Sequence, residues 1–129
     1  MTDFKVDVVA ISETRLPVSS SINFPGFKCY RQDRHSSGYG QGVAILVKNS
    51  IKHTCIHIPN TTHIEAVGLK VHVSGVEYII ISIYQSPNRL LVSQDLDILF
   101  NLGENVLIMG DFNARHEQWY GNVNNKHGR

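Results

Sequence analysis

The sequence predicts an α/β protein in which a sandwich of mixed β-sheets carries helices on its outside. Its middle section is a series of short apolar runs rich in β-branched residues, which are typical of buried strands. Only one segment, which ends at Gly103, has apolar residues at helical spacing: Leu91, Leu96, Leu99 and Phe100. A last apolar run after this segment indicates a final strand, so strands dominate the chain.

The predicted strands are separated by clear turn signals. In chain order they are expected at Lys5–Ser12, Phe27–Arg31, Val43–Lys48, Ile64–Val73, Val76–Tyr84 and Asn105–Gly110. Residues 19–26 and 35–40 are rich in Ser, Gly, Asn or Pro and are expected to be loops, as is Pro59–Thr62. Ser74-Gly75, between two strands, predicts a tight hairpin.

Length and composition indicate one domain of an ordinary globular protein. The chain has 129 residues, of which 42% are hydrophobic and 18% charged. The formal net charge is +1, so the overall charge does not point to a nucleic-acid partner. A local basic groove remains an alternative to scattered surface charges, with candidate residues Arg31, Arg34, Lys48, Lys52, Arg89 and Arg115.

Two further features bear on location. No apolar run approaches the roughly 18 residues of a membrane helix, so no membrane partner is expected. Cys29 and Cys55 form no CxxC pair, and no signal peptide precedes them. Buried free thiols in a reducing, intracellular compartment are therefore expected.

The end of the last predicted strand carries the most specific pattern, Gly110-Asp111-Phe112-Asn113. On a strand, residues two apart point to the same face, so Asp111 and Asn113 can address one ligand together. A carboxylate beside a neutral amide suits a phosphate held near a hard cation. The alternative is a turn in which both side chains bond only the local backbone.

Four segments follow one another as they do in the endonuclease/exonuclease/phosphatase superfamily, which the chain resembles over nearly its whole length. They are Asp7–Thr14, Gly40–Val47, Ile81–Pro87 and Leu107–Ala114, the last followed by His116, Trp119 and Gly121. The pattern is most similar to the apurinic-endonuclease-like endonuclease domain of non-LTR retrotransposons, the jockey-like mobile elements. The resemblance implies a four-layer αββα sandwich, Mg²⁺ as cofactor with Mn²⁺ as a substitute, and DNA as substrate.

The resemblance also assigns roles to five residues. Glu13 would be the metal ligand, and Tyr84 would position the scissile phosphate. Asp111 would orient or deprotonate the attacking water, and Asn113 would hold a phosphate oxygen. His116 stands near the phosphate in the retroelement pattern. The ordinary alternative for Glu13 is a solvated acid, and for Tyr84 it is packing with its hydroxyl at the surface.

The superfamily pattern is longer than this chain. It begins with a strand bearing an active-site asparagine and ends with strands carrying an aspartate and a Ser-Asp-His type motif, so residues 1–129 are expected to form a partial domain, incomplete at both ends. The expected function is a metal-dependent phosphodiesterase, the DNA-nicking endonuclease of a non-LTR retrotransposon, weakly active or inactive as this fragment. A downstream reverse transcriptase domain and a nuclear location are implied for the full-length element protein. The alternatives are a non-enzymatic remnant and a phosphatase or exonuclease of the same fold.

Overall fold

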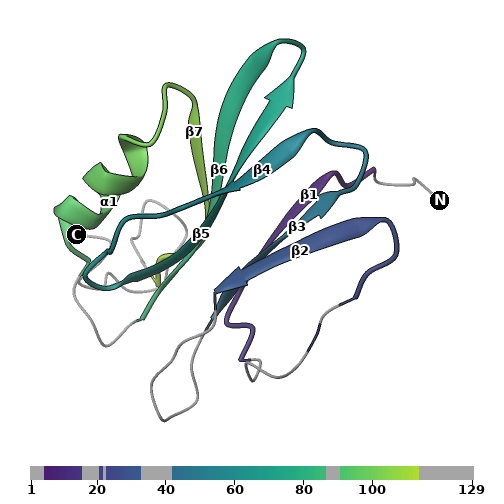
Figure 1. Cartoon of the computed structure of the whole chain (residues 1–129). Helices are drawn as coiled ribbons and strands as arrows, with labels where there is room; N and C mark the ends of the chain where they lie inside the picture. The colour runs from purple at the N-terminus through teal and green to yellow at the C-terminus, as the bar shows by residue number, and fades with distance from the viewer. Residues whose placement is uncertain (1–4, 16–20, 22, 33–41, 87–90, 114–129) are drawn as a thin grey trace.

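The computed structural model describes residues 5–15, 21, 23–32, 42–86 and 91–113 (Figure 1). This part of the chain contains seven strands and one helix. In order they are β1 (Val8–Ser12), β2 (Phe27–Gln32), β3 (Val43–Lys48), β4 (His53–Ile56), β5 (Ile64–Val73), β6 (Val76–Gln85), α1 (Ser93–Phe100) and β7 (Val106–Asp111).

The strands form two sheets that face one another (Figure 1). The smaller sheet has the order β1-β3-β2 and is antiparallel throughout. The larger sheet has the order β4-β5-β6-β7, in which only the β6–β7 pair is parallel. A parallel pair needs a crossover connection, and α1 lies within it. The carboxyl ends of β6 and β7 therefore lie at the same edge of the sheet.

Alternate residues of the central strands form the core between the sheets. Val43, Ile45 and Val47 of β3 pack in one cluster with apolar residues of β5 such as Leu69, because residues two apart share a face. Each of these three valine and isoleucine side chains has no exposed surface, and full burial of such a side chain contributes about 1.5–3 kcal/mol. Tyr84 closes this cluster at the carboxyl end of β6.

Helix α1 covers the other face of the larger sheet, the side away from β1–β3 in Figure 1. Leu99 is fully buried there in a cluster with Ile79, Ile81 and Ile83 of β6. The described residues thus form helix, sheet and sheet layers of the expected α/β sandwich. This helix is not long and apolar enough to cross a membrane.

The six predicted strands are confirmed, with ends that differ by at most three residues. The hairpin turn has positive φ at Ser74 (51°) and Gly75 (78°), as in a type I′ turn, whose twist matches that of the strands it joins. The helix begins at Ser93, so Leu91 precedes it.

Strand β4 was not among the predicted strands, and it explains an error in the cysteine prediction. It is an edge strand of four residues with only one aliphatic side chain, Ile56. Cys55 lies in it and is exposed, while Cys29 is half-buried. The expectation that both thiols are buried is therefore wrong, although neither thiol forms a disulfide in the described part of the chain.

Candidate functional site

The carboxyl ends of β1, β6 and β7 meet at one edge of the sandwich. The parallel register of β6 and β7 pairs Tyr84 with Asp111. Strand β1 belongs to the opposite sheet, and Glu13 follows its last residue, Ser12. The sequence-predicted residues Glu13, Tyr84 and Asp111 are therefore delivered by three strands of two different sheets.

Ser12 joins these three strand ends through its hydroxyl group. Its Oγ donates to the carbonyl of Ile83 at 2.9 Å and accepts from the backbone N–H of Asp111 at 3.3 Å. At the preceding residue of each strand a second bond runs the opposite way, from β6 to β1. Ser82 Oγ donates to the carbonyl of Ile11 at 3.4 Å. These directional bonds connect the two sheets beside the site, whereas the core behind them is apolar.

Tyr84 is the centre of the group. It is 2% exposed, and burial raises the pKa of its phenol because the phenolate would lose hydration. The hydrogen bond to Glu13 and the charges of Glu13 and Asp111 raise the pKa further, while a hydrogen bond from Asn113 opposes them. The structure therefore brings Glu13 and Asn113 to the Tyr84 hydroxyl, with Asp111 paired to Tyr84 on the neighbouring strand.

The backbone is unusual at two of these residues. Glu13 and Asn113 have φ values of 54° and 48°, in the left-handed region that asparagine tolerates and glutamate rarely adopts. Such conformations cost roughly 1–3 kcal/mol and persist only where the surroundings enforce them. The next residue, Thr14, donates its N–H to the carbonyl of Gly42 at 3.3 Å. Gly42 has φ +67°, and a side chain there would collide with Thr14 Oγ1.

Asp111 and Asn113 form a compact turn. The N–H of Asn113 donates to Asp111 Oδ1 at 2.7 Å, and Asn113 Nδ2 donates to the carbonyl of Gln85 at 2.7 Å. The local backbone bond that was the alternative interpretation of this pattern is therefore present. It does not enclose Asp111, which is exposed, so solvent or a substrate can reach its carboxylate.

The acids at this edge suit a lightly coordinated hard cation better than a closed metal site. No group of three or more His, Cys, Asp or Glu residues that could hold a metal is found among the described residues. Mg²⁺ often takes only one or two carboxylates and completes its shell with water and substrate oxygens. Glu13 and Asp111 fit that pattern. Glu13 also lies 3.5 Å from Arg15, in a solvent-exposed pair that contributes little to stability.

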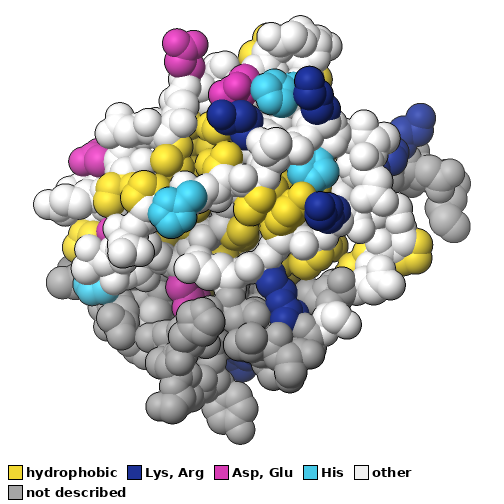
Figure 2. Space-filling model, in the orientation of Figure 1, with side chains coloured by type: hydrophobic (Ala, Val, Ile, Leu, Met, Phe, Trp, Pro, Cys, Tyr) yellow, Lys and Arg dark blue, Asp and Glu magenta, His cyan; other side chains and the backbone are white. Residues whose placement is uncertain are grey.

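Some predicted residues fall outside the described part of the chain. His116 is one, as are Trp119 and Gly121. Arg34, Arg89 and Arg115 of the candidate basic groove are also outside it. On the face shown in Figure 2, Lys and Arg side chains are interspersed with His and acidic side chains around a band of hydrophobic atoms.

Two residues that support the site were not singled out from the sequence. Ser12 stands between an apolar run and Glu13, and this placement of a small hydroxyl was the available signal. Gly110 has φ +140°, and a side chain there would collide with the carbonyl oxygen of Ile83. Glycine at this position therefore allows β7 to lie close to β6 one residue before Asp111.

These strand ends and this pair of sheets define a protein of the endonuclease/exonuclease/phosphatase class. The sequence profile described as "Endonuclease/Exonuclease/phosphatase family" matches residues 1–129, and the chain belongs to that family.

Similar proteins come from mobile elements. The chain is 30% identical over 129 residues to the probable RNA-directed DNA polymerase from transposon BS of Drosophila melanogaster, covering 97% of this chain and 14% of that protein. It is 25% identical over 123 residues to the RNA-directed DNA polymerase from mobile element jockey of the same organism, covering 95% of this chain and 13% of that protein. The chain thus spans about one seventh of the length of these relatives.

A solved structure supports the fold. The endonuclease domain of TRAS1, a telomere-specific non-LTR retrotransposon, superposes with a TM-score of 0.69 at 17% sequence identity. The match covers 95% of this chain and 53% of that one. It confirms the predicted fold class.

Proposed function

We propose that the chain is the front and middle part of a DNA-nicking endonuclease domain, a Mg²⁺-dependent phosphodiesterase of a non-LTR retrotransposon protein. The observation that carries the proposal is the grouping of Glu13, Asp111 and Asn113 beside the buried Tyr84 in a member of this family. The similarity to mobile-element proteins favours DNA over lipid or nucleotide substrates.

Each of these side chains has chemistry that suits phosphodiester hydrolysis. Glu13, with Asp111 beside it, would hold Mg²⁺, which supplies positive charge to neutralise a phosphate when it is bound. The phenol of Tyr84 is protonated at neutral pH, and its pKa is raised further, so its hydroxyl would donate to a phosphate oxygen in place of Glu13. The exposed carboxylate of Asp111 can orient a water and accept its proton. The amide of Asn113 can donate to a phosphate oxygen without adding charge.

We propose that the whole endonuclease domain is longer than these 129 residues, because the match covers only 53% of the TRAS1 chain. The histidine and second aspartate implied by the family resemblance would complete the catalytic set. Catalytic groups that act as a unit lose most of their effect when one is missing. General acid–base assistance alone contributes about 10²–10⁴-fold, so the 129 residues alone should turn over very slowly. In the full-length protein we place a reverse transcriptase downstream and the site of action in the nucleus.

A plasmid-nicking assay tests this function. Supercoiled DNA and Mg²⁺ are incubated with the 129-residue chain, with a version extended along its reading frame, and with Glu13→Gln and Glu104→Gln variants of the extended version. Glu104 is an exposed acid in the loop between α1 and β7, so it is a matched control.

We expect nicking by the extended protein and by its Glu104→Gln variant, and loss of nicking in Glu13→Gln. Undiminished nicking by Glu13→Gln would overturn the site assignment. No nicking by any version would favour a non-enzymatic remnant. Glu13-dependent nicking by the 129 residues alone would show that the partial set suffices.

A further inference from the structure

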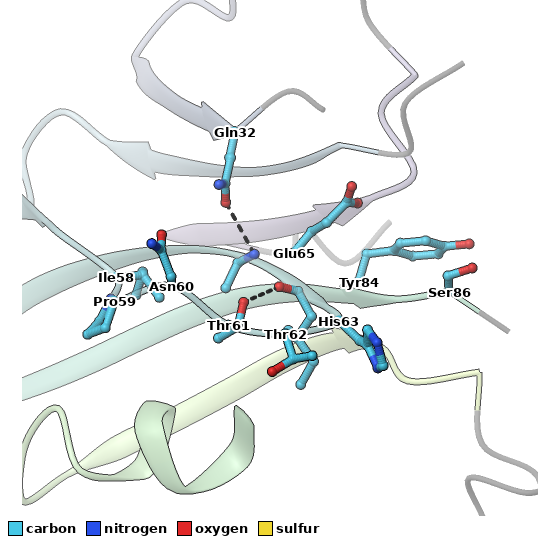
Figure 3. Close-up of a pocket in the computed structure, with 12 residues that line it drawn as sticks. Gln32, Ile58, Pro59, Asn60, Thr61, Thr62, His63, Glu65, Tyr84 and Ser86 are labelled. Carbon is cyan, nitrogen blue, oxygen red and sulfur yellow. Dashed lines mark hydrogen bonds between the residues drawn. The ribbon is translucent and has the colours of Figure 1, made fainter. Parts of the chain in front are cut away.

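A polar pocket lies beside Tyr84, where the ends of both sheets meet the segment between β4 and β5 (Figure 3). Its volume is about 250 Å³. Gln32 enters from the end of β2, Glu65 from β5, and Tyr84 and Ser86 from the end of β6. Pockets for drug-sized ligands are roughly 300–1,000 Å³, so this one suits a single ring system rather than a larger molecule.

The lining is largely polar, and its one basic side chain among the described residues is His63. The described lining residues include two amides, Gln32 and Asn60, and the hydroxyls of Thr61, Thr62 and Ser86, but no Lys or Arg. Phosphate is usually bound by Arg, Lys or a cluster of backbone N–H groups, and the carboxylate of Glu65 would disfavour an anion. Neutral donors and acceptors side by side instead match the edge of a nucleobase, which Asn and Gln recognise well.

The wall of the pocket is held in place by a buried acid behind it. Asp95, in the first turn of α1, has no exposed surface. Its carboxylate accepts from the backbone N–H groups of Thr62 (2.7 Å), His63 (2.8 Å) and Ile64 (3.1 Å). These residues form the pocket wall, and Thr61 Oγ1 adds a bond to the carbonyl of Ile64.

The opposite side of the pocket is also ordered by a hydrogen bond. Gln32 Oε1 accepts from the N–H of Ala66 at 3.3 Å, which fixes the orientation of its amide (Figure 3). A pocket whose walls are already held loses less conformational entropy when it binds a ligand. The polar groups therefore form a pre-organised site rather than a mobile surface.

Tyr84 connects this pocket to the candidate catalytic residues. It lines the pocket and also hydrogen-bonds with Glu13 and Asn113. A nucleotide whose phosphate lies at those residues would place a neighbouring base towards the pocket.

We propose that the pocket beside Tyr84 is a nucleobase subsite, which takes the base of a nucleotide adjacent to the scissile phosphate. The position of the phosphate rests on the proposed function, whereas the preference for a neutral base over an anion rests on the pocket lining alone. Asn60 is the residue chosen for the test, because its amide lies at the pocket and Asn60→Asp replaces a donor by an acceptor.

The first arm measures binding without catalysis. Amide NMR spectra of the chain are recorded with each of the four deoxynucleosides and, separately, with inorganic phosphate. We expect nucleosides to shift the amide signals of Thr62 and His63, and phosphate to leave them unchanged. Asn60→Ala should weaken the preferred nucleoside about 5–10-fold, the size of one lost hydrogen bond. Equal shifts with phosphate, or none with any nucleoside, would overturn the proposal.

The second arm uses nicking of a randomised DNA library by the extended protein. Asn60→Asp should change the preferred base at one position next to the nick. Asn49→Asp should leave the base preference unchanged. Asn49 is an exposed asparagine directly after the carboxyl end of β3, away from the pocket. If Asn60→Asp nicks DNA with an unchanged base preference, the proposed base subsite is contradicted, whereas the proposed endonuclease function is not. Nucleoside binding at Thr62 and His63 without nicking would support the base pocket and count against the endonuclease.

Discussion

Replacement of Asp95 by alanine tests how far one buried carboxylate holds the pocket wall. The substitution removes the acceptor of three N–H groups, at 2.7, 2.8 and 3.1 Å. These groups differ in their access to water. Thr62 is exposed and His63 half-buried, so water can replace the lost acceptor there, whereas Ile64 is only 4% exposed.

The expected loss follows from these differences. An unsatisfied buried donor costs about 1–3 kcal/mol, which applies fully to Ile64 and in part to the other two residues. Loss of an acid near the positive end of α1 adds about 0.3–1 kcal/mol. Together we expect Asp95→Ala to lower the free energy of unfolding by about 3 kcal/mol. A domain of ordinary stability, about 5–15 kcal/mol, would still fold.

Urea unfolding followed by circular dichroism measures this change. Asp97→Ala is the matched control, because Asp97 lies on the same helix and is exposed. It should change stability by less than about 0.5 kcal/mol. Asp95→Asn keeps the shape but turns one acceptor into a donor, so an intermediate loss is expected. A loss below about 1 kcal/mol for Asp95→Ala, or an equal loss for Asp97→Ala, would refute the reasoning.

Three further changes act directly on the candidate site. Ser12→Ala removes the bond to the Ile83 carbonyl and the acceptor of the Asp111 N–H, so unfolding free energy should fall by about 1–2 kcal/mol in urea titrations; an unchanged midpoint would contradict this. Gly110→Ala places a side chain against the Ile83 carbonyl, at a residue whose φ is +140°, so the melting temperature should drop by about 10 °C. An unchanged melting temperature would show that β7 can move to make room for the side chain. The raised pKa of Tyr84 means that the fold favours its neutral form: this stabilisation is fully present below the unfolded value of about 10 and is lost as pH rises through the higher folded pKa. Stability measured between pH 8 and 12 should therefore fall less steeply in Tyr84→Phe than in the parent chain, and identical pH profiles would count against it.

The strands could be predicted because each carries its own signal. Val43–Lys48 is a continuous apolar run, and it forms β3 with the same bounds. His53–Ile56 has no such run, and it becomes a strand only because it pairs with β5 at the sheet edge. A tertiary partner decides this element, so its own four residues do not reveal it.

The residues of the candidate site also differ in how far the local sequence reveals them. Glu13, Tyr84, Asp111 and Asn113 stand in short segments that resemble known ones. The residues that hold the site in place depend on partners far away in the chain, such as Ser12, which is 71 residues from Ile83 and 99 from Asp111. Asp95 likewise reads as an ordinary acid at a helix start, although it binds backbone more than 30 residues earlier.

The placement of Glu13 and Asp111 on opposite sheets makes their separation sensitive to sliding between the sheets. Hydrogen-bonded strands within a sheet have a fixed register, but apolar contacts between sheets have no preferred direction and resist shear weakly. The reciprocal bonds of Ser12 and Ser82 run in opposite directions between β1 and β6, so a displacement along the strands strains both together. A change of side-chain volume in the core between β3 and β5 would shift one sheet slightly against the other. The two carboxylates would then move relative to each other, although the changed residue contacts neither of them. Core substitutions such as Leu69→Val would then alter the spacing of Glu13 and Asp111, and variants selected for tighter or looser cation binding should include positions in the sandwich interior.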